Sequence, residues 1–235
     1  MGITTDFMRL DVDGQPMQAF VARPERPGLG MLVLQEAFGV NGHIRDIAQR
    51  YANVGFTAIA PELFHRTAPP GFEAPYGDFE ALRPHYSALT SDGLVADMRA
   101  AYGWLANEAK VPANRIAAVG YCMGGRCAYL ANAAFPLAAA ISYYGGGIAP
   151  DLLDRASRQH GPILMFWGGL DEHIPSEQYR AVADALTAAG VDHVQVVFSK
   201  ADHGFNCNAR PSFNPSASRQ AFALALEFLR VHGVL

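Results

Sequence analysis

The chain has 235 residues, of which 50% are hydrophobic and 17% charged, and its formal net charge at pH 7 is −4. This length suits one domain with a sizeable core, and the composition excludes a disordered chain. Lysine and arginine are scattered along the sequence, so neither a nucleic-acid-binding surface nor a basic membrane-binding patch is expected.

Nothing in the sequence indicates export or membrane insertion. The first six residues lack the basic and apolar regions of a signal peptide, and no apolar run is long enough to span a membrane. The three cysteines have neither the spacing of a disulfide framework nor that of a zinc site. We therefore expect a reduced, cytoplasmic protein, a monomer or small homo-oligomer, whose partner is a small-molecule substrate and which needs no metal or cofactor.

Apolar runs alternate with stretches of helical periodicity along the chain. The run at 31–34 is continuously apolar, as in a parallel strand covered on both faces, whereas 17–21 alternates weakly and is expected to be an edge strand. The expected strands are 17–21, 31–34, 56–60, 115–119, 137–143, 162–167 and 193–198, and the expected helices are 44–52, 94–105, 127–134, 175–190 and 217–228.

This alternation predicts an α/β fold with a mostly parallel, doubly wound sheet and helices on both faces, in a single domain over residues 1–235. Residues 61–90 break the pattern, because prolines and glycines recur through them. Long irregular insertions in compact domains are usually functional. We expect this one to be a lid or cap over the site, with a short helix near 79–86.

Cys122 lies in the sequence Gly-Tyr-Cys-Met-Gly-Gly, between the strand expected at 115–119 and the helix expected from 127. A strand, a Gly-x-nucleophile-x-Gly turn and a helix together form the nucleophile elbow of α/β-hydrolases. The turn would place the thiol at a helix N-terminus, where unpaired N–H groups favour a thiolate. The alternative is a glycine-rich turn around a buried core cysteine.

Two later residues complete a candidate catalytic triad. Asp171 follows the strand expected at 162–167, and His203 follows the strand expected at 193–198. The order nucleophile, acid, base is that of α/β-hydrolases, in which the histidine moves the proton and the carboxylate orients the histidine. Each residue alone is compatible with an ordinary loop, but all three follow the appropriate strands in the appropriate order.

The loop after the strand at 31–34 is expected to supply one oxyanion-hole donor. The candidate donors are the backbone N–H groups of Ala37 and Met123. Glu36 immediately precedes Ala37, and a permanent negative charge there would oppose the charge that the hole stabilises. A carboxylate near Cys122 would favour the protonated thiol, whereas the alternative is a surface acid paired with an arginine.

Four motifs together are similar to those of the dienelactone hydrolase family, and the resemblance spans nearly the whole chain. They are Gln-Glu-Ala-Phe-Gly-Val-Asn at 35–41, Gly-Tyr-Cys-Met-Gly-Gly at 120–125, Gly-Gly-Leu-Asp-Glu-His-Ile-Pro at 168–175 and His-Gly-Phe at 203–205. The resemblance implies an α/β-hydrolase fold, Cys122 as nucleophile, Asp171 and His203 as its partners, and Glu36 as an accessory base.

The resemblance also implies substrate-binding arginines, of which this chain keeps only part. One belongs in the lid, where Arg83 is the candidate; the position of the second, shortly after the histidine, is Cys207, and Arg210 is displaced by three residues. The candidate substrate-binding residues are Phe38, Tyr144, Arg83, Phe205 and Cys207.

The expected function is therefore hydrolysis of a small lactone or carboxylic ester through an acyl-cysteine. A thioesterase or acyl transferase with the same triad, a ligand-binding protein without activity and a redox sensor built on Cys122 are the alternatives. We expect Cys127 to be a core residue, and we expect His43, His65 and His173 to lie on loops near the site without binding a metal.

Overall fold

The fold is described from a computed structural model, which places residues 2–235. These residues form one eight-stranded sheet in the order β1-β2-β4-β3-β5-β6-β7-β8. The strands are β1 (Ile3–Val12), β2 (Gln15–Pro24), β3 (Leu29–Leu34), β4 (Phe56–Pro61), β5 (Ile116–Tyr121), β6 (Ala139–Tyr143), β7 (Ile163–Gly168) and β8 (His193–Phe198). The α-helices are α1 (Gly42–Asn53), α2 (Phe79–Ser87), α3 (Ser91–Asn107), α4 (Met123–Ala134), α5 (Ser176–Ala188) and α6 (Pro215–Val231), and short 3₁₀ turns lie at Ala113–Arg115 and Leu153–Arg158.

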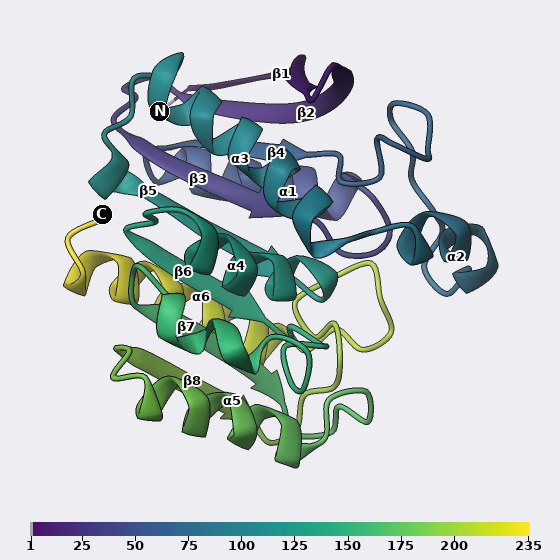
Figure 1. Ribbon diagram of the computed structural model, residues 1–235, viewed down its shortest axis with the longest axis vertical. Coiled ribbons are helices and arrows are strands. Elements are labelled where there is room, and N and C mark those ends of the chain that lie inside the picture. The colour runs from purple at the N-terminus through teal and green to yellow at the C-terminus, as the bar shows by residue number, and fades with distance from the viewer. Residues whose placement is uncertain (1) are drawn as a thin grey trace.

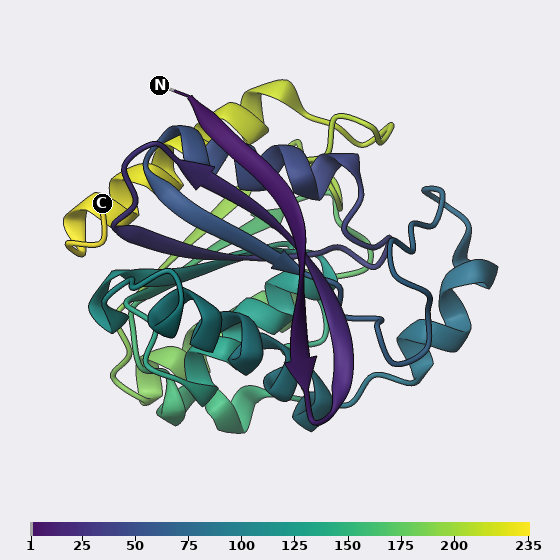
Figure 2. The ribbon, with the colours of Figure 1, turned by 90° about the horizontal axis from the view of Figure 1, so that it is seen from above.

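The sheet is antiparallel at one end and parallel across the rest. Strand β2 pairs antiparallel with both β1 and β4, whereas β4, β3, β5, β6, β7 and β8 run parallel. Helices α1 and α6 cover one face, and α3, α4 and α5 cover the other (Figure 2). This is the predicted doubly wound arrangement, in which helices on both faces bury the parallel strands.

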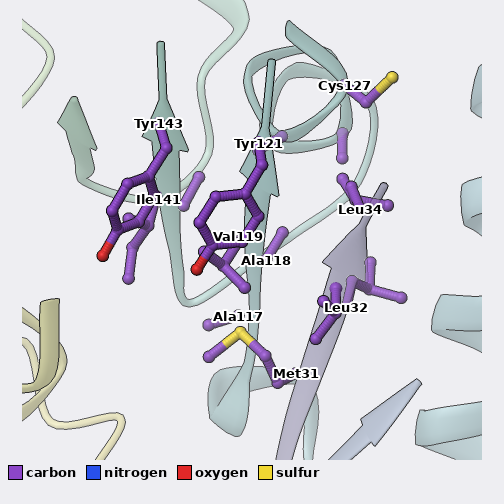
Figure 3. Close-up of a cluster of buried hydrophobic side chains, with 14 of the residues drawn as sticks. Met31, Leu32, Leu34, Ala117, Ala118, Val119, Tyr121, Cys127, Ile141 and Tyr143 are labelled. Atoms are coloured by element: carbon purple, nitrogen blue, oxygen red, sulfur yellow. The ribbon is translucent and has the colours of Figure 1, made fainter. Parts of the chain in front are cut away.

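The central strands are buried along their whole length. Every residue of β4, β5, β6 and β7 is buried, which explains why their sequences are almost entirely apolar, with Thr57 and Ser142 as exceptions, and do not alternate. Figure 3 shows part of this core, where the rings of Tyr121 and Tyr143 lie side by side on neighbouring strands. Both tyrosines end their strands directly before loops of the candidate site, so the core reaches up to that site.

The first hairpin corrects one prediction. Residues 17–21 belong to β2, which is not an edge strand, because β1 pairs with it along its outer side. Strand β1 is mostly exposed, so its sequence lacks the apolar run that would reveal it. Asp13 and Gly14 form the turn with φ of 53° and 79°, the left-handed conformations that a tight hairpin requires.

The insertion at 61–90 carries α2, in agreement with the short helix expected there. This helix stands apart from the sheet, at the end to which the parallel strands point (Figure 1). The base of the insertion is tied to the body of the domain through Asp97 on α3, which is fully buried and contacts His65 Nε2 at 2.9 Å and Arg66 Nη1 at 2.7 Å. The insertion is therefore fixed where it leaves the sheet.

Two glycines allow the turn between β5 and α4 to pack against its neighbours. A Cβ atom on Gly120 would lie 1.8 Å from the carbonyl oxygen of Gly124, and one on Gly124 would lie 2.1 Å from the carbonyl oxygen of Leu34. Both obstacles are backbone atoms, which cannot rotate away. Only glycine fits these positions, and the close approach brings α4 against the end of β3.

We expect Gly124→Ala to lower the thermal midpoint of unfolding by at least about 6 °C. Overpacking against fixed backbone costs about 3 kcal/mol or more, and each kcal/mol shifts the midpoint of a chain this size by about 2–4 °C. Scanning calorimetry measures the shift. Gly28→Ala is the matched control, since nothing lies within 4 Å of the added methyl, and it should leave the midpoint unchanged. An equal effect of both substitutions would contradict this packing account.

Candidate active site

Cys122 occupies the tip of the turn between β5 and α4. Its φ is 54° and its ψ −117°, a conformation that costs energy for a residue with a side chain. The surrounding backbone holds the turn, because the N–H of Cys122 donates to Tyr143 at 3.0 Å and its carbonyl accepts from Gly125 at 2.9 Å. The thiol is partly exposed. This geometry matches the predicted elbow and excludes a buried core cysteine.

The two other predicted triad members meet the thiol. His203 Nε2 lies 3.1 Å from Cys122 Sγ, and His203 Nδ1 lies 2.8 Å from Asp171 Oδ2. The other oxygen of Asp171 accepts backbone N–H bonds from His173 at 2.9 Å and Ile174 at 3.1 Å. The carboxylate is thus held in one orientation and presents a single oxygen to the histidine.

The surroundings of His203 favour its protonated form. Burial by itself lowers the pKa of His203, but the hydrogen bonds to Asp171 and Cys122 and the charges of both groups outweigh burial and raise the pKa to about 10. At neutral pH the ring therefore carries a positive charge beside the sulfur. A thiolate paired with an imidazolium is the reactive state of a cysteine nucleophile.

A cavity of about 480 Å³ opens above the thiol. Its wall contains Cys122, His203 and the predicted oxyanion donors, and one side is formed by α2. The lining residues are Ala37, Phe38, Phe79, Leu82, Arg83, Tyr86, Ser87, Cys122, Met123, Gly146, Gly147, His173, Ile174, His203 and Arg210. The space suits a small organic molecule, enclosed mainly by apolar side chains with a few polar groups.

The cavity is also lined by Phe79, Leu82 and Tyr86, which are not among the residues expected from the sequence, although their spacing could have identified them. Together with Arg83 they are spaced at i, i+3, i+4 and i+7, which places them on one face of α2. That spacing identifies the face of the helix that turns toward the body of the protein.

Ala37 and Met123 both line the cavity beside Cys122. Met123 is the first residue of α4, so its N–H has no partner within the helix. Within residues 2–235, neither N–H donates to another protein group. Two free backbone donors on the wall of the cavity that holds the thiol are the kind of groups from which an oxyanion hole is built.

Glu36 is completely buried and lies behind the cavity wall. Its Oε1 accepts a hydrogen bond from Tyr144 at 3.4 Å and lies 3.6 Å from Arg210 Nη1. Burial raises the pKa of Glu36, and the charge of Arg210 partly opposes this rise. The expected contact with the thiol is not formed, since no hydrogen bond joins Glu36 to Cys122 within residues 2–235. Each of the two alternatives for Glu36 is met in part: the side chain is buried, as expected for a carboxylate near Cys122, and it pairs with an arginine, as expected for a surface acid.

The five predicted substrate-binding residues separate into two groups. Phe38 and Arg83 line the cavity. Tyr144, Phe205 and Cys207 are fully buried outside its lining: the rings of Tyr144 and Phe205 pack together with centroids 5.1 Å apart, and Cys207 donates to a tyrosine hydroxyl. Arg210, displaced in the sequence, nevertheless reaches the cavity.

The remaining histidines and cysteine differ in part from expectation. His173 lies in the loop after β7 and lines the cavity. His43 is not in a loop but in the first turn of α1, where burial and then the charge of Arg50 lower its pKa to about 4. His65 lies away from the cavity, paired with Asp97. Cys127 is buried on α4, as expected for a core residue (Figure 3).

Comparison with known proteins identifies the family of this chain. The model of the "Dienelactone hydrolase family" matches residues 17–233. A "Putative carboxymethylenebutenolidase" of Escherichia coli O157:H7 is 33% identical over 243 residues, covering 98% of this chain and 88% of the relative. One of the same name from Synechocystis is 33% identical over 201 residues, covering 82% and 81%. The crystal structure of a "Putative Dienelactone Hydrolase" from Klebsiella pneumoniae matches with a TM-score of 0.89 at 30% identity, covering 98% and 99% of the two chains.

The chain belongs to the dienelactone hydrolase family. It is accordingly a hydrolase of carboxylic esters or lactones with the α/β-hydrolase fold, which confirms the family and the fold predicted from its motifs. Within residues 2–235, no helix combines the length and apolar character needed to cross a membrane.

The pairing of Cys122 with His203 predicts how alkylation depends on pH. An ordinary thiol loses roughly a hundredfold in thiolate, and so in reactivity, between pH 8 and pH 6. Because the pKa of His203 is about 10, its charge persists over this range, and the rate at Cys122 should fall far less. Iodoacetamide labelling followed by mass spectrometry measures the rate at each cysteine. His203→Gln should restore the steep fall, and a steep fall in the unmodified enzyme would show that the pair is not charged.

Proposed function

We propose that this hydrolase cleaves a small lactone or ester through a covalent acyl-cysteine on Cys122. The observation that carries the proposal is the line of contacts from Asp171 through His203 to the sulfur, at 2.8 Å and 3.1 Å, which opens into an apolar cavity. A ligand-binding protein or a simple redox sensor has no need of a carboxylate, an imidazole and a thiol in this register.

In the first half-reaction the thiolate of Cys122 attacks the substrate carbonyl. The oxygen becomes negative and is stabilised by the N–H groups of Ala37 and Met123. The carbon–oxygen bond to the leaving group breaks, and His203 gives its proton to the departing alkoxide. An ester releases its alcohol at this point, whereas a lactone ring opens and its hydroxyl stays attached to the acyl group.

In the second half-reaction water hydrolyses the thioester. Neutral His203 takes a proton from the water as its oxygen attacks the acyl carbon, and collapse of the tetrahedral intermediate releases the carboxylic acid and the thiolate. Asp171 keeps Nδ1 of the ring protonated throughout, so Nε2 always faces the reaction.

Glu36 has a separate role in this scheme. Its Oε1 faces Arg210 and Tyr144, so the thiol is free to pair with His203 in the state described here. As an accessory base, Glu36 would hold the thiol protonated only after turning away from Arg210. A substrate anion that binds Arg210 competes with Glu36 for the guanidinium, which links substrate charge to the position of the carboxylate.

Substitutions in the triad should separate the roles of its members. With p-nitrophenyl acetate, Cys122→Ala should retain at most a few per cent of the rate, His203→Ala should lose about 10³-fold, and Asp171→Asn should lose less, because a thiolate–imidazolium pair needs less help than a serine. Steady-state kinetics measures the rates, and mass spectrometry after an acid quench detects the acyl group. Cys127→Ser is the matched control. Substantial turnover by Cys122→Ala, or an acyl group on another residue, would refute the mechanism.

Two arginines on the cavity wall predict acceptance of an anionic substrate. Arg83 is exposed on α2, and a charge pair in water contributes at most about 1 kcal/mol, so Arg83→Ala should raise KM for p-nitrophenyl hemisuccinate by roughly two- to fivefold. KM for neutral p-nitrophenyl acetate should not change. Arg219→Ala, an exposed substitution on α6, is the control. Equal changes for both esters would mean that Arg83 contributes shape rather than charge.

A further inference from the structure

Three potential metal-binding side chains meet behind the catalytic cavity. They are Glu36 after β3, His43 in the first turn of α1, and Cys207 in the loop after β8. One ligand atom from each, a carboxylate oxygen, a ring nitrogen and the sulfur, lie within 4.8 Å of one another. All three residues are buried, and none of them lines the catalytic cavity.

Several polar atoms in this cluster have no partner. Within residues 2–235, Glu36 Oε2 and both ring nitrogens of His43 make no hydrogen bond, although each is inaccessible to solvent. Buried polar atoms are nearly always satisfied, and three orphaned acceptors or donors in one small volume require a ligand or ordered water. The unpartnered oxygen of the carboxylate is Oε2, whereas Oε1 faces Arg210.

We propose that Glu36, His43 and Cys207 form a binding site for Zn²⁺ behind the catalytic triad, and that Glu36 does not act as an accessory base while it holds the metal. A thiolate, a neutral imidazole and a carboxylate are the ligands that zinc prefers, and a water molecule would complete the tetrahedron. Tetrahedral zinc places such ligand atoms about 3.3–3.7 Å apart. The ligand atoms, which lie within 4.8 Å of one another, must therefore approach by roughly 1 Å for the site to close.

The neighbours of Cys207 suit a metal-bound thiolate. Its sulfur lies 3.1 Å from the hydroxyl oxygen of Tyr76, which also accepts a hydrogen bond from Asn41 Nδ2 at 2.9 Å. When the thiol loses its proton to the solvent on binding zinc, the hydroxyl of Tyr76 can turn and donate to the sulfur. Asn41 continues to donate to the same hydroxyl oxygen. Such second-layer hydrogen bonds orient and stabilise metal ligands.

The charges at the site balance. A carboxylate and a thiolate together neutralise Zn²⁺, so the filled site carries no net charge. The guanidinium of Arg210, 3.6 Å from Glu36 Oε1, opposes a bare cation but not a neutral cluster. The guanidinium faces Oε1, so we assign the unpartnered Oε2 to the metal.

A second hollow borders the cluster on the side of His43. This hollow of about 400 Å³ is lined by His43, Tyr76 and six other residues and shares no residue with the catalytic cavity. The hollow ends at His43, so zinc that approaches from this side does not pass the thiol of Cys122. The ligands come from residues 36, 43 and 207, so their spacing in the sequence does not resemble a zinc motif.

The test uses Cys122→Ala protein, in which the catalytic thiol cannot bind a metal, and Co²⁺ as a coloured substitute for zinc. Titration with Co²⁺ should produce a thiolate-to-cobalt charge-transfer band that saturates at one equivalent and disappears when one equivalent of Zn²⁺ is added. Isothermal calorimetry with Zn²⁺ should give the same stoichiometry. Absence of the band up to millimolar Co²⁺ overturns the proposal without any further substitution.

Substitution of each ligand then locates the site. In the Cys122→Ala background, Cys207→Ser should remove the band, and His43→Gln should weaken metal binding by more than the ~10–100-fold typical of an outer hydrogen-bonding partner. Cys127→Ser is the matched control and should keep the band, since Cys127 is buried elsewhere on α4. Circular dichroism checks that each variant is folded. A band that survives Cys207→Ser assigns the metal to another thiol and overturns the proposal.

Discussion

The position of the Cys122 thiol depends on one backbone turn, in which the chain leaves β5 and enters α4 within a single residue. Only Cys122 separates the last residue of the strand from the first of the helix, and its φ of 54° is what makes so sharp a turn possible. Glycines at 120 and 124 remove the side chains that would hold α4 away from the sheet. The strain is thus balanced by packing that no other residue type permits, and the thiol is held above the edge of the sheet.

Parallel strands bring the remaining groups to the same edge. The strands β3, β5, β7 and β8 all end there, so the loops that follow them meet although they are up to about 170 positions apart in the chain. Asp171 follows β7 and His203 follows β8, and these two strands are neighbours. The hydrogen bond between the two side chains therefore follows from strand order. In this fold, the order of Asp171 and His203 along the chain therefore predicts that their side chains are in contact.

Most of the fold could be predicted because its signals are local. Buried parallel strands are apolar throughout, and the helices show a 3.6-residue period, so β8 and the helix in the insertion were placed within a residue or two. Strand β1 could not be predicted in this way. It is a largely exposed edge strand that pairs only with β2, so it needs no apolar run. Its one sequence signal was the Asp-Gly turn at 13–14.

The contacts among Cys122, His203 and Asp171 could be predicted for the same reason, since each residue follows a recognisable strand. The directions of buried polar side chains could not, because they depend on contacts between distant segments. Glu36 was expected near the thiol or at the surface, and it is instead buried against Arg210. Cys207 was assigned to the pocket from its distance to His203 in the sequence, but its side chain turns to Tyr76.

The loop after β8 carries both His203 and Arg210, which line the same cavity. Gly204 has a φ of 78°, and a Cβ atom there would lie 2.3 Å from Arg210 Nη1, so the chain turns at Gly204 and leaves room for the guanidinium. Arg210 then lies over the rings of Phe38 and Tyr76, 5.8 Å from each centroid, and reaches Glu36. A side chain at 204 would displace the guanidinium of Arg210 and would be strained by the positive φ. The histidine that contacts the thiol and the arginine that pairs with Glu36 are therefore positioned by a few residues of one loop.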